Sequence, residues 1–171
     1  MTALAYTHGF PNQLAFRVQS SAVSDFGSKL SELLRTATSH VRNNATDWRS
    51  FTKALVEEIA RECQLPNWDG YGAHPISERA KKQAQIFIDM LPYNFPRPDP
   101  MPDPDGEIAL CWDFGPGHVF TLSVNSTGML SYAGLLGEGV KRHGMEQIKD
   151  KIPKSILESI KELCERSNVI C

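Results

Sequence analysis

The sequence predicts an α+β domain in which helices cover one face of a small antiparallel β-meander of three to four strands. Apolar residues recur at intervals of three and four over 46–64, 77–91 and 154–167, which is typical of amphipathic helices. Between 108 and 135 apolar and polar residues alternate instead, and glycine-containing turns interrupt them, as in strands joined by hairpins. A chain of 171 residues, 41% of them hydrophobic, has the size and composition of one globular domain.

The first 65 residues are expected to be mainly helical. Ser24 and Asp25 are favourable start residues for a helix over about 25–38. The apolar stripe of this helix comprises Phe26, Leu30, Leu33, Leu34 and Ala37. A second helix, over 46–64, is predicted to carry the stripe Trp48, Phe51, Leu55, Ile59 and Cys63 and to end before Pro66.

A loop, a third helix and a connector are expected next. Residues 67–77, NWDGYGAHPIS, predict a rigid loop anchored in the core by Trp68 and Tyr71. Ser77 is expected to cap a helix that Pro92 ends. The stripe of this helix is Ala80, Ala84, Phe87, Ile88 and Leu91. The six prolines in 92–104 predict an extended connector with little internal hydrogen bonding.

Three strands and a final helix complete the predicted domain. One strand is expected over 108–114, the next over 120–124 after the turn Gly115-Pro116-Gly117, and the third over 129–135. The helix over 154–167 carries the stripe Ile156, Ile160, Leu163 and Cys164, which is suited to cover the apolar face of the strands. We therefore expect one domain over 1–171, with a mainly helical part over 1–65, an α+β core over 66–153 and a C-terminal helix over 154–171.

Compartment and cofactors follow from what the sequence lacks. Residues 1–19 have no basic start followed by an apolar run, and no later apolar stretch reaches membrane-spanning length. We therefore expect a cytoplasmic protein that does not contact a membrane. The four cysteines are widely spaced and are interpreted as reduced thiols, so no metal site and no cofactor are predicted.

Two segments resemble a known group of proteins. WDGYGAHPIS at 68–77 and PDGEIALCW at 104–112, with a glycine-rich turn after Leu130-Ser131-Tyr132-Ala133, resemble a family of small uncharacterised bacterial proteins. The likeness covers about 66–153. Proteins of this kind look like cargo of mobile elements or of toxin and defence loci, and the resemblance therefore implies a cytosolic bacterial or phage module. It assigns no functional residue.

An enzyme would draw its catalytic groups from the loop and the strand ends. Asp69 or Glu107 could act as a general base with His74 as the acid, in a small hydrolase or transferase. Asp69-Gly70 and Asp105-Gly106 are also turn dipeptides, whose carboxylates commonly bond their own backbone. We favour this structural interpretation and keep catalysis as the alternative.

Two features are weaker candidates for binding anions. Gly137 and Gly139, with Lys141 and Arg142, could form an anion-binding nest, but no helix is predicted directly after them as in a phosphate loop. Lys141, Arg142 and the lysines of 149–154 could contact nucleic acid. A net charge of −2 disfavours nucleic acid as a partner, and we rank this hypothesis third.

The charge distribution gives the leading functional hypothesis. No Lys or Arg occurs between Pro98 and Val140, while six acidic residues do. Asp99, Asp103, Asp105 and Asp113 are the predicted contact residues for a partner. An acidic surface suits a basic or nucleic-acid-binding protein. We therefore expect a non-enzymatic protein-binding module, such as an inhibitor, antitoxin or defence or anti-defence accessory, whose interface also uses the helix over 25–38.

Overall fold

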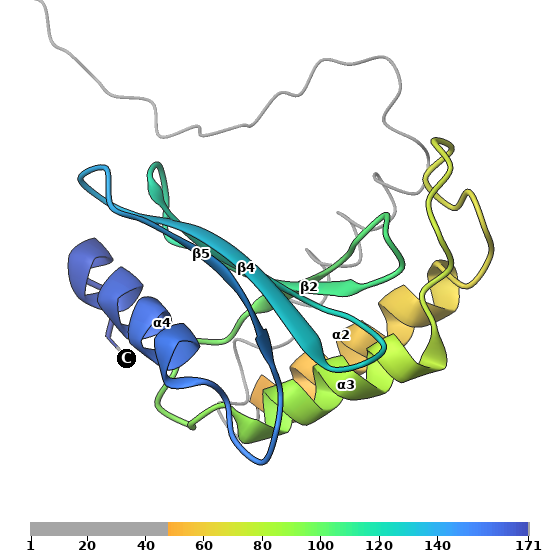
Figure 1. The fold of residues 1–171 in the computed structure, drawn as a ribbon, viewed down its shortest axis with the longest axis horizontal. Coiled ribbons are helices and arrows are strands. Elements are labelled where there is room, and N and C mark those ends of the chain that lie inside the picture. The colour runs from red at the N-terminus through yellow and green to blue at the C-terminus, as the bar shows by residue number, and fades with distance from the viewer. Residues whose placement is uncertain (1–47, 171) are drawn as a thin grey trace, which may run out of the picture.

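The computed structural model describes residues 48–170 as helices on one side of an antiparallel sheet (Figure 1). The elements in chain order are α2 (Trp48–Glu62), α3 (Glu78–Met90), β1 (Asp99–Pro102), β2 (Ile108–Asp113), β3 (His118–Val124), β4 (Met129–Leu136), β5 (Lys141–Gln147) and α4 (Lys154–Ser167). The strand order is β1-β2-β3-β4-β5, so each strand pairs with the next along the chain. The predicted α+β meander is confirmed. The helix predicted over 25–38 lies outside the described residues.

The sheet has five strands within 48–170, so the expected three to four strands were too few. The first addition, β1, comes from the predicted connector and pairs with Ile108–Cys111 of β2. The Asp103 N–H donates to the Glu107 carbonyl at 3.1 Å. Backbone N–H groups along a strand point alternately to the two sides, so positions 100 and 102 point away from β2 when position 103 points toward it. The missing N–H groups of Pro100 and Pro102 therefore fall on the open edge of β1, where no partner strand needs a donor.

The second addition, β5, pairs with β4 along its whole length. Its sequence, KRHGMEQ, lacks the alternation of apolar and polar residues that marks a half-buried strand. Only pairing with β4 makes it a strand, and charged residues on such an edge also discourage pairing with another chain.

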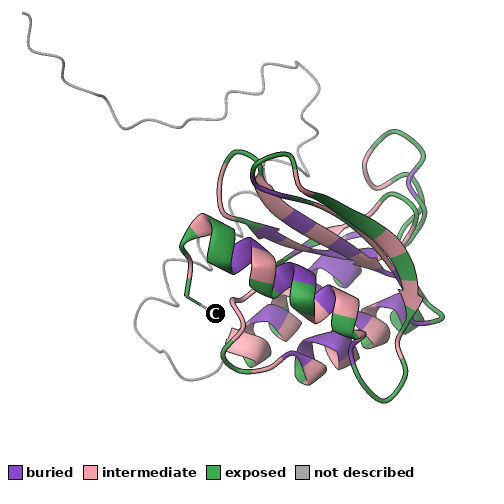
Figure 2. Ribbon diagram, turned by 60° about the vertical axis from the view of Figure 1, so that its left-hand side comes forward, coloured by how far each residue is buried: buried purple, intermediate pink, exposed green. Residues whose placement is uncertain are grey.

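The core lies between the sheet and the helices, and Figure 2 shows buried residues of the two layers facing each other. Ile108, Leu110 and Trp112 of β2 are buried there. Phe120, Leu122 and Val124 of β3 continue the same face. The predicted stripes of α3 and α4 are confirmed: Ala80, Ala84, Phe87, Ile88, Leu91, Ile156, Ile160, Leu163 and Cys164 are fully buried.

The predicted stripe of α2 is confirmed at Ile59 and Cys63, which are buried, but it is rotated in the first turns of the helix. Thr52 and Val56 are buried, whereas Phe51 and Leu55 are only partly buried. Thr52 can be buried because its hydroxyl donates to the Trp48 carbonyl at 2.8 Å. Phe51 instead lies under the guanidinium of Arg97, whose carbon is 5.1 Å from the ring centre.

Among residues 48–170, no helix combines the length and the apolar character needed to cross a membrane.

Candidate functional site

The five strands have a second face that none of α2, α3 and α4 covers (Figure 1). Side chains alternate along a strand, so the neighbours of the buried core residues belong to this face. We call it the open face, formed by Asp99, Met101, Ala109, Cys111, Asp113, Val119, Thr121, Ser123, Met129, Ser131, Ala133, Leu135, Lys141, His143, Met145 and Gln147. One row of paired residues crosses the whole sheet: Asp99, Cys111, Thr121, Ala133 and His143.

The middle of the open face is apolar or carries small side chains. Two adjoining hollows of about 610 and 360 Å³ share Thr121, Ala133 and His143 as lining residues. Leu135, at 42% exposure, and Met145, at 69%, are large hydrophobic residues beside them. The open face therefore offers an apolar depression across β3, β4 and β5.

The β1–β2 side of the open face is acidic. Asp99 lies in β1 beside Cys111, and Asp113 lies two residues further along β2. Partial burial is the main cause that raises the pKa of the Cys111 thiol, and the carboxylates of Asp113 and Asp99 raise it further. Asp99 keeps 59% of its side chain exposed although it pairs with Arg97 at 3.2 Å.

Three more acidic residues follow in the turn between β1 and β2. The Asp103 carboxylate accepts the Ser123 hydroxyl at 2.9 Å and the Asp105 N–H at 3.2 Å, so it holds the turn against β3. Burial, and then the charges of Asp103 and Asp105, raise the pKa of Glu107. We call Asp99, Asp103, Asp105, Glu107 and Asp113 the acidic strip. The structure thus brings the predicted partner-binding aspartates onto two neighbouring strands and their turn.

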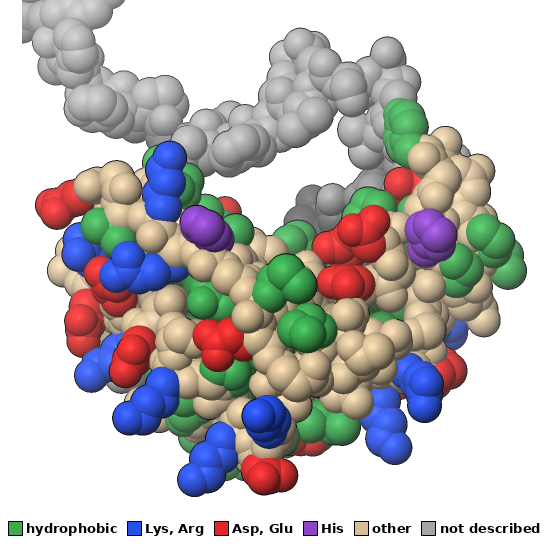
Figure 3. All heavy atoms as spheres, viewed as in Figure 1, with side chains coloured by type: hydrophobic (Ala, Val, Ile, Leu, Met, Phe, Trp, Pro, Cys, Tyr) green, Lys and Arg blue, Asp and Glu red, His purple; other side chains and the backbone are tan. Residues whose placement is uncertain are grey.

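The opposite edge of the open face carries a lysine and a histidine. Lys141 and His143 belong to it, while the intervening Arg142 points to the covered side and pairs with Glu162 of α4 at 2.9 Å. Figure 3 shows acidic side chains gathered on one side of central hydrophobic ones, with Lys, Arg and a histidine at the other end.

The loop over 67–77 is held by hydrogen bonds within itself. The Asp69 carboxylate accepts the backbone N–H groups of Tyr71 at 2.8 Å and Ala73 at 3.1 Å. The Trp68 indole N–H donates to the His74 carbonyl at 2.9 Å, and its ring packs against the core. Tyr71 is 76% exposed, so its predicted role as a core anchor was wrong. Its ring is displaced from the core because the polar turn at Asp69-Gly70 carries it outward.

The three residues of the acid–base hypothesis lie in the loop over 67–77 and in the β1–β2 turn. The backbone N–H of His74 donates to the Pro104 carbonyl at 2.8 Å, so the loop lies against the β1–β2 turn. The backbone N–H group of Tyr71 is the main cause that lowers the pKa of Asp69, which places this carboxylate in a turn. Catalysis by Asp69, His74 and Glu107 stays a prediction.

The glycines of the predicted anion nest form the β4–β5 turn. The Gly137 N–H donates to the Gly117 carbonyl at 2.8 Å, and a side chain at 137 would meet the His118 ring at 2.5 Å. Gly139 has a φ of +76°, which suits glycine in this turn. Since the Gly137 N–H is occupied and Arg142 is paired with Glu162, the contacts describe a structural turn. Anion binding here stays a prediction.

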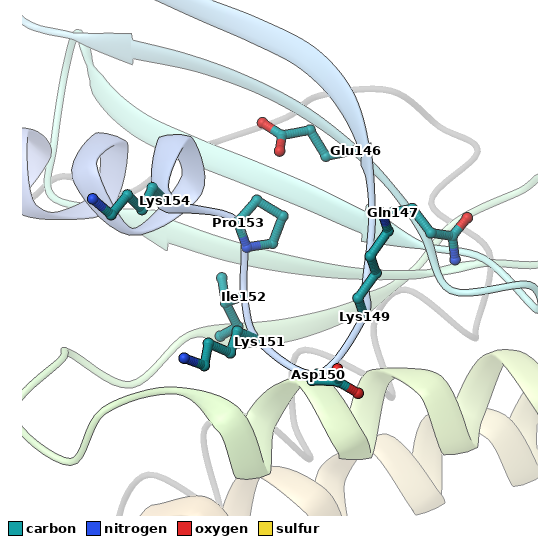
Figure 4. Close-up of a pocket in the computed structure, with 8 residues that line it drawn as sticks. All are labelled: Glu146, Gln147, Lys149, Asp150, Lys151, Ile152, Pro153 and Lys154. Atoms are coloured by element: carbon teal, nitrogen blue, oxygen red, sulfur yellow. The ribbon is translucent and has the colours of Figure 1, made fainter.

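The predicted nucleic-acid residues fall in two separate places. Lys149, Lys151 and Lys154 surround a hollow of about 610 Å³ between β5 and α4 (Figure 4). Lys141 and Arg142 lie at the other end of β5, roughly 20 Å away at ~3.3 Å per residue. The structure therefore does not gather these cations into one patch.

The cysteines are not all reduced thiols, as the sequence had indicated. Cys63 and Cys111 are free, and burial raises the pKa of Cys63 to about 12. Cys164 is disulfide-bonded, which corrects the expectation. In the part of the chain from 48 to 170, no group of three or more His, Cys, Asp and Glu residues is arranged to hold a metal ion.

Comparison of the chain with protein-family models, with characterised proteins and with solved structures found no match. The acidic strip was predictable because charge is visible in the sequence. The apolar depression was missed, since Thr121, Ala133 and His143 come from three strands and have no shared signal along the chain.

Proposed function

We propose that this protein is a non-enzymatic protein-binding module whose open face binds a basic surface of its partner. The observation that supports it is the acidic strip on a sheet face that no described helix covers. The narrower role that we propose, an inhibitor, antitoxin or defence or anti-defence accessory in the cytoplasm, depends on the resemblance predicted from the segments 68–77 and 104–112.

The two parts of the open face contribute differently to binding. Exposed charges such as Asp99 steer the encounter and act mainly on the association rate, with a strong dependence on salt. Contact with the apolar depression, which includes Leu135 and Met145, would slow dissociation by removing apolar surface from water. The acidic strip therefore sets which partner approaches, and the depression holds it.

The structure decides which acidic residues make a clean test. Asp103 and Asp113 are left unchanged because their carboxylates accept backbone N–H groups of turns, that of Asp113 from Gly115 at 2.9 Å. Asp99 and Asp105 are exposed, and we would change both to Lys. The matched control changes Asp150 and Glu158 to Lys. These residues are exposed and lie on or before α4, which packs on the covered face. The control therefore changes the net charge as much as the strip variant does, but away from the open face.

The assay compares binding of an arginine-rich peptide, and capture of proteins from the native host, by the wild type and both variants. We expect the strip variant to lose the peptide and the captured partner, while the control variant keeps both. Binding by the wild type should weaken steeply between 50 and 500 mM salt, because the Debye length falls from about 14 to about 4 Å and the exposed charges are screened. Equal binding by all three proteins would contradict the proposal.

A further inference from the structure

We infer that the helix predicted over 25–38 docks on the apolar depression of the open face, across β3, β4 and β5. The bound segment would make the sheet the middle of three layers. This inference concerns the chain's own N-terminal segment. Because the segment would cover the depression that the proposed function gives to the partner, a partner would displace the segment from it. The experiment that tests the inference uses no partner, so its failure would leave the proposed function undecided.

The first argument is the apolar surface that the described residues leave uncovered. Val119, Ala133, Leu135 and Met145 belong to the same part of the open face, and Leu135 and Met145 are exposed. A contiguous apolar patch on a protein surface usually marks a contact. The small residues at its centre leave the hollows of about 610 and 360 Å³, which large side chains from a helix would fill.

The second argument is a matching stripe elsewhere in the same chain. Phe26, Leu30, Leu33, Leu34 and Ala37 follow the spacing i, i+4, i+7, i+8 and i+11, which places all five on one side of a helix. Ser28 and Arg35 fall on the opposite side. A helix of this kind buries its apolar side against another element. The three described helices already cover the other face of the sheet (Figure 1).

The third argument is where the described chain begins. Phe51, in the first turn of α2, lies under the Arg97 guanidinium, and Arg97 pairs with Asp99 at 3.2 Å. Asp99 is the first member of the row that crosses the open face to His143. The chain at Trp48 therefore enters the described fold beside the β1 edge of the open face.

The linker between position 38 and Trp48 is long enough to reach β4, and the helix over 25–38 is about as long as the sheet is wide. Ten residues separate position 38 from Trp48 and span at most ~33 Å, whereas β4 is three strand spacings, ~14 Å, from β1. A helix of 14 residues is ~21 Å long, and a five-stranded sheet is ~19 Å wide. The short tether also gives the segment a high local concentration, which favours it over a second copy of the chain.

The test uses the full chain and its own residues as probes. Cys111 and Met145 report on the open face: the rate of Cys111 alkylation by iodoacetamide and of Met145 oxidation by peroxide would be measured by peptide mass spectrometry. Cys63 is buried with a pKa of about 12, so its alkylation reports unfolding of the core.

Three variants are compared with the wild type. The helix variant is Leu30→Asp with Leu34→Asp, its control is Ser28→Asp, and the reciprocal variant is Ala133→Asp on the sheet.

We expect slow reaction of Cys111 and Met145 in the wild type and in Ser28→Asp. Both should react at least about tenfold faster in the helix variant and in Ala133→Asp, because the local opening controls access to these residues. If Ala133→Asp also exposes Cys63, the helix variant decides, since it changes no residue of the described core. Equal rates in the wild type and the helix variant would overturn the inference. Protection that disappears on dilution would also overturn it, because a second copy would then be the cover.

Discussion

Gly106, in the turn that carries the acidic strip, provides the sharpest test of how the loop over 67–77 is held. Its φ is +81°, and a side chain there would lie 2.8 Å from the Pro75 carbonyl oxygen and 3.3 Å from the His74 Cβ. Gly70 has almost the same φ, +80°, but a side chain there would meet nothing within 4 Å. The pair therefore separates the cost of the backbone conformation from the cost of the contact.

The magnitudes can be worked out for both alanine variants. A left-handed conformation costs a residue with a side chain ~1–2 kcal/mol, and the smaller entropy of the unfolded chain returns ~0.4–1 kcal/mol. Gly70→Ala should then lower the free energy of unfolding by about 1 kcal/mol. Gly106→Ala adds ~1–3 kcal/mol of overpacking against backbone atoms that cannot rotate away, for a loss of about 2–4 kcal/mol.

Equilibrium unfolding in urea measures both losses, and the midpoint should shift without a change in slope if the variants affect only the folded state. The melting temperature offers a second readout, at roughly 3–5 °C per kcal/mol for a chain of this size. Equal losses for Gly70→Ala and Gly106→Ala would refute the tight contact between the loop and the β1–β2 turn.

Four further predictions follow from single contacts. Trp68→Ala should lower the free energy of unfolding by about 2–4 kcal/mol, since the ring packs against the core, whereas Tyr71→Ala should change it by less than ~0.5 kcal/mol; chemical denaturation distinguishes them. Ser77→Ala removes the hydroxyl that accepts the Ala80 N–H at 3.1 Å and should cost ~1 kcal/mol in the same assay. The raised pKa of Glu107 means that ionisation of its carboxyl group destabilises the folded state. As pH rises through that pKa, Glu107→Gln should therefore become more stable relative to the wild type, which urea titrations from pH 4 to 8 would measure. The lowered pKa of Asp69 has the opposite sign: its contribution is present above its usual pKa and is lost as pH falls through the folded value, so Asp69→Asn should flatten the acid side of the stability profile.

Much of the fold was predictable where local signals and tertiary contacts agree. The stripe of α3 and the cap at Ser77 were predicted position by position, because a period of 3.6 residues and a capping hydroxyl are properties of a short segment. The alternation over 108–124 likewise identified β2 and β3 and the side chains that enter the core.

The wrong predictions concern β1, β5 and Tyr71, whose structure depends on contacts with residues outside their own segments. Nothing in DPMP or KRHGMEQ is typical of a strand, yet β2 and β4 make strands of them by supplying backbone partners. Tyr71 is a large aromatic residue of the kind that often anchors a loop in a core, but its position in this loop directs its side chain to solvent. These outcomes depend on what surrounds each segment in space.

The sequence by itself determined the α+β class, the periodic helices, the hairpin order and the concentration of acidic residues between Pro98 and Val140, because each is a property of composition or of short-range spacing. Only the tertiary structure decided that the sheet has five strands within 48–170, because β1 and β5 become strands through the backbone partners that β2 and β4 supply. It also decided that Asp99, Cys111, Thr121, Ala133 and His143 form one row across the open face. The physical reason is register: a shift of one residue in any strand pair would move its side chains to the opposite face, and only the packing of the core fixes that choice.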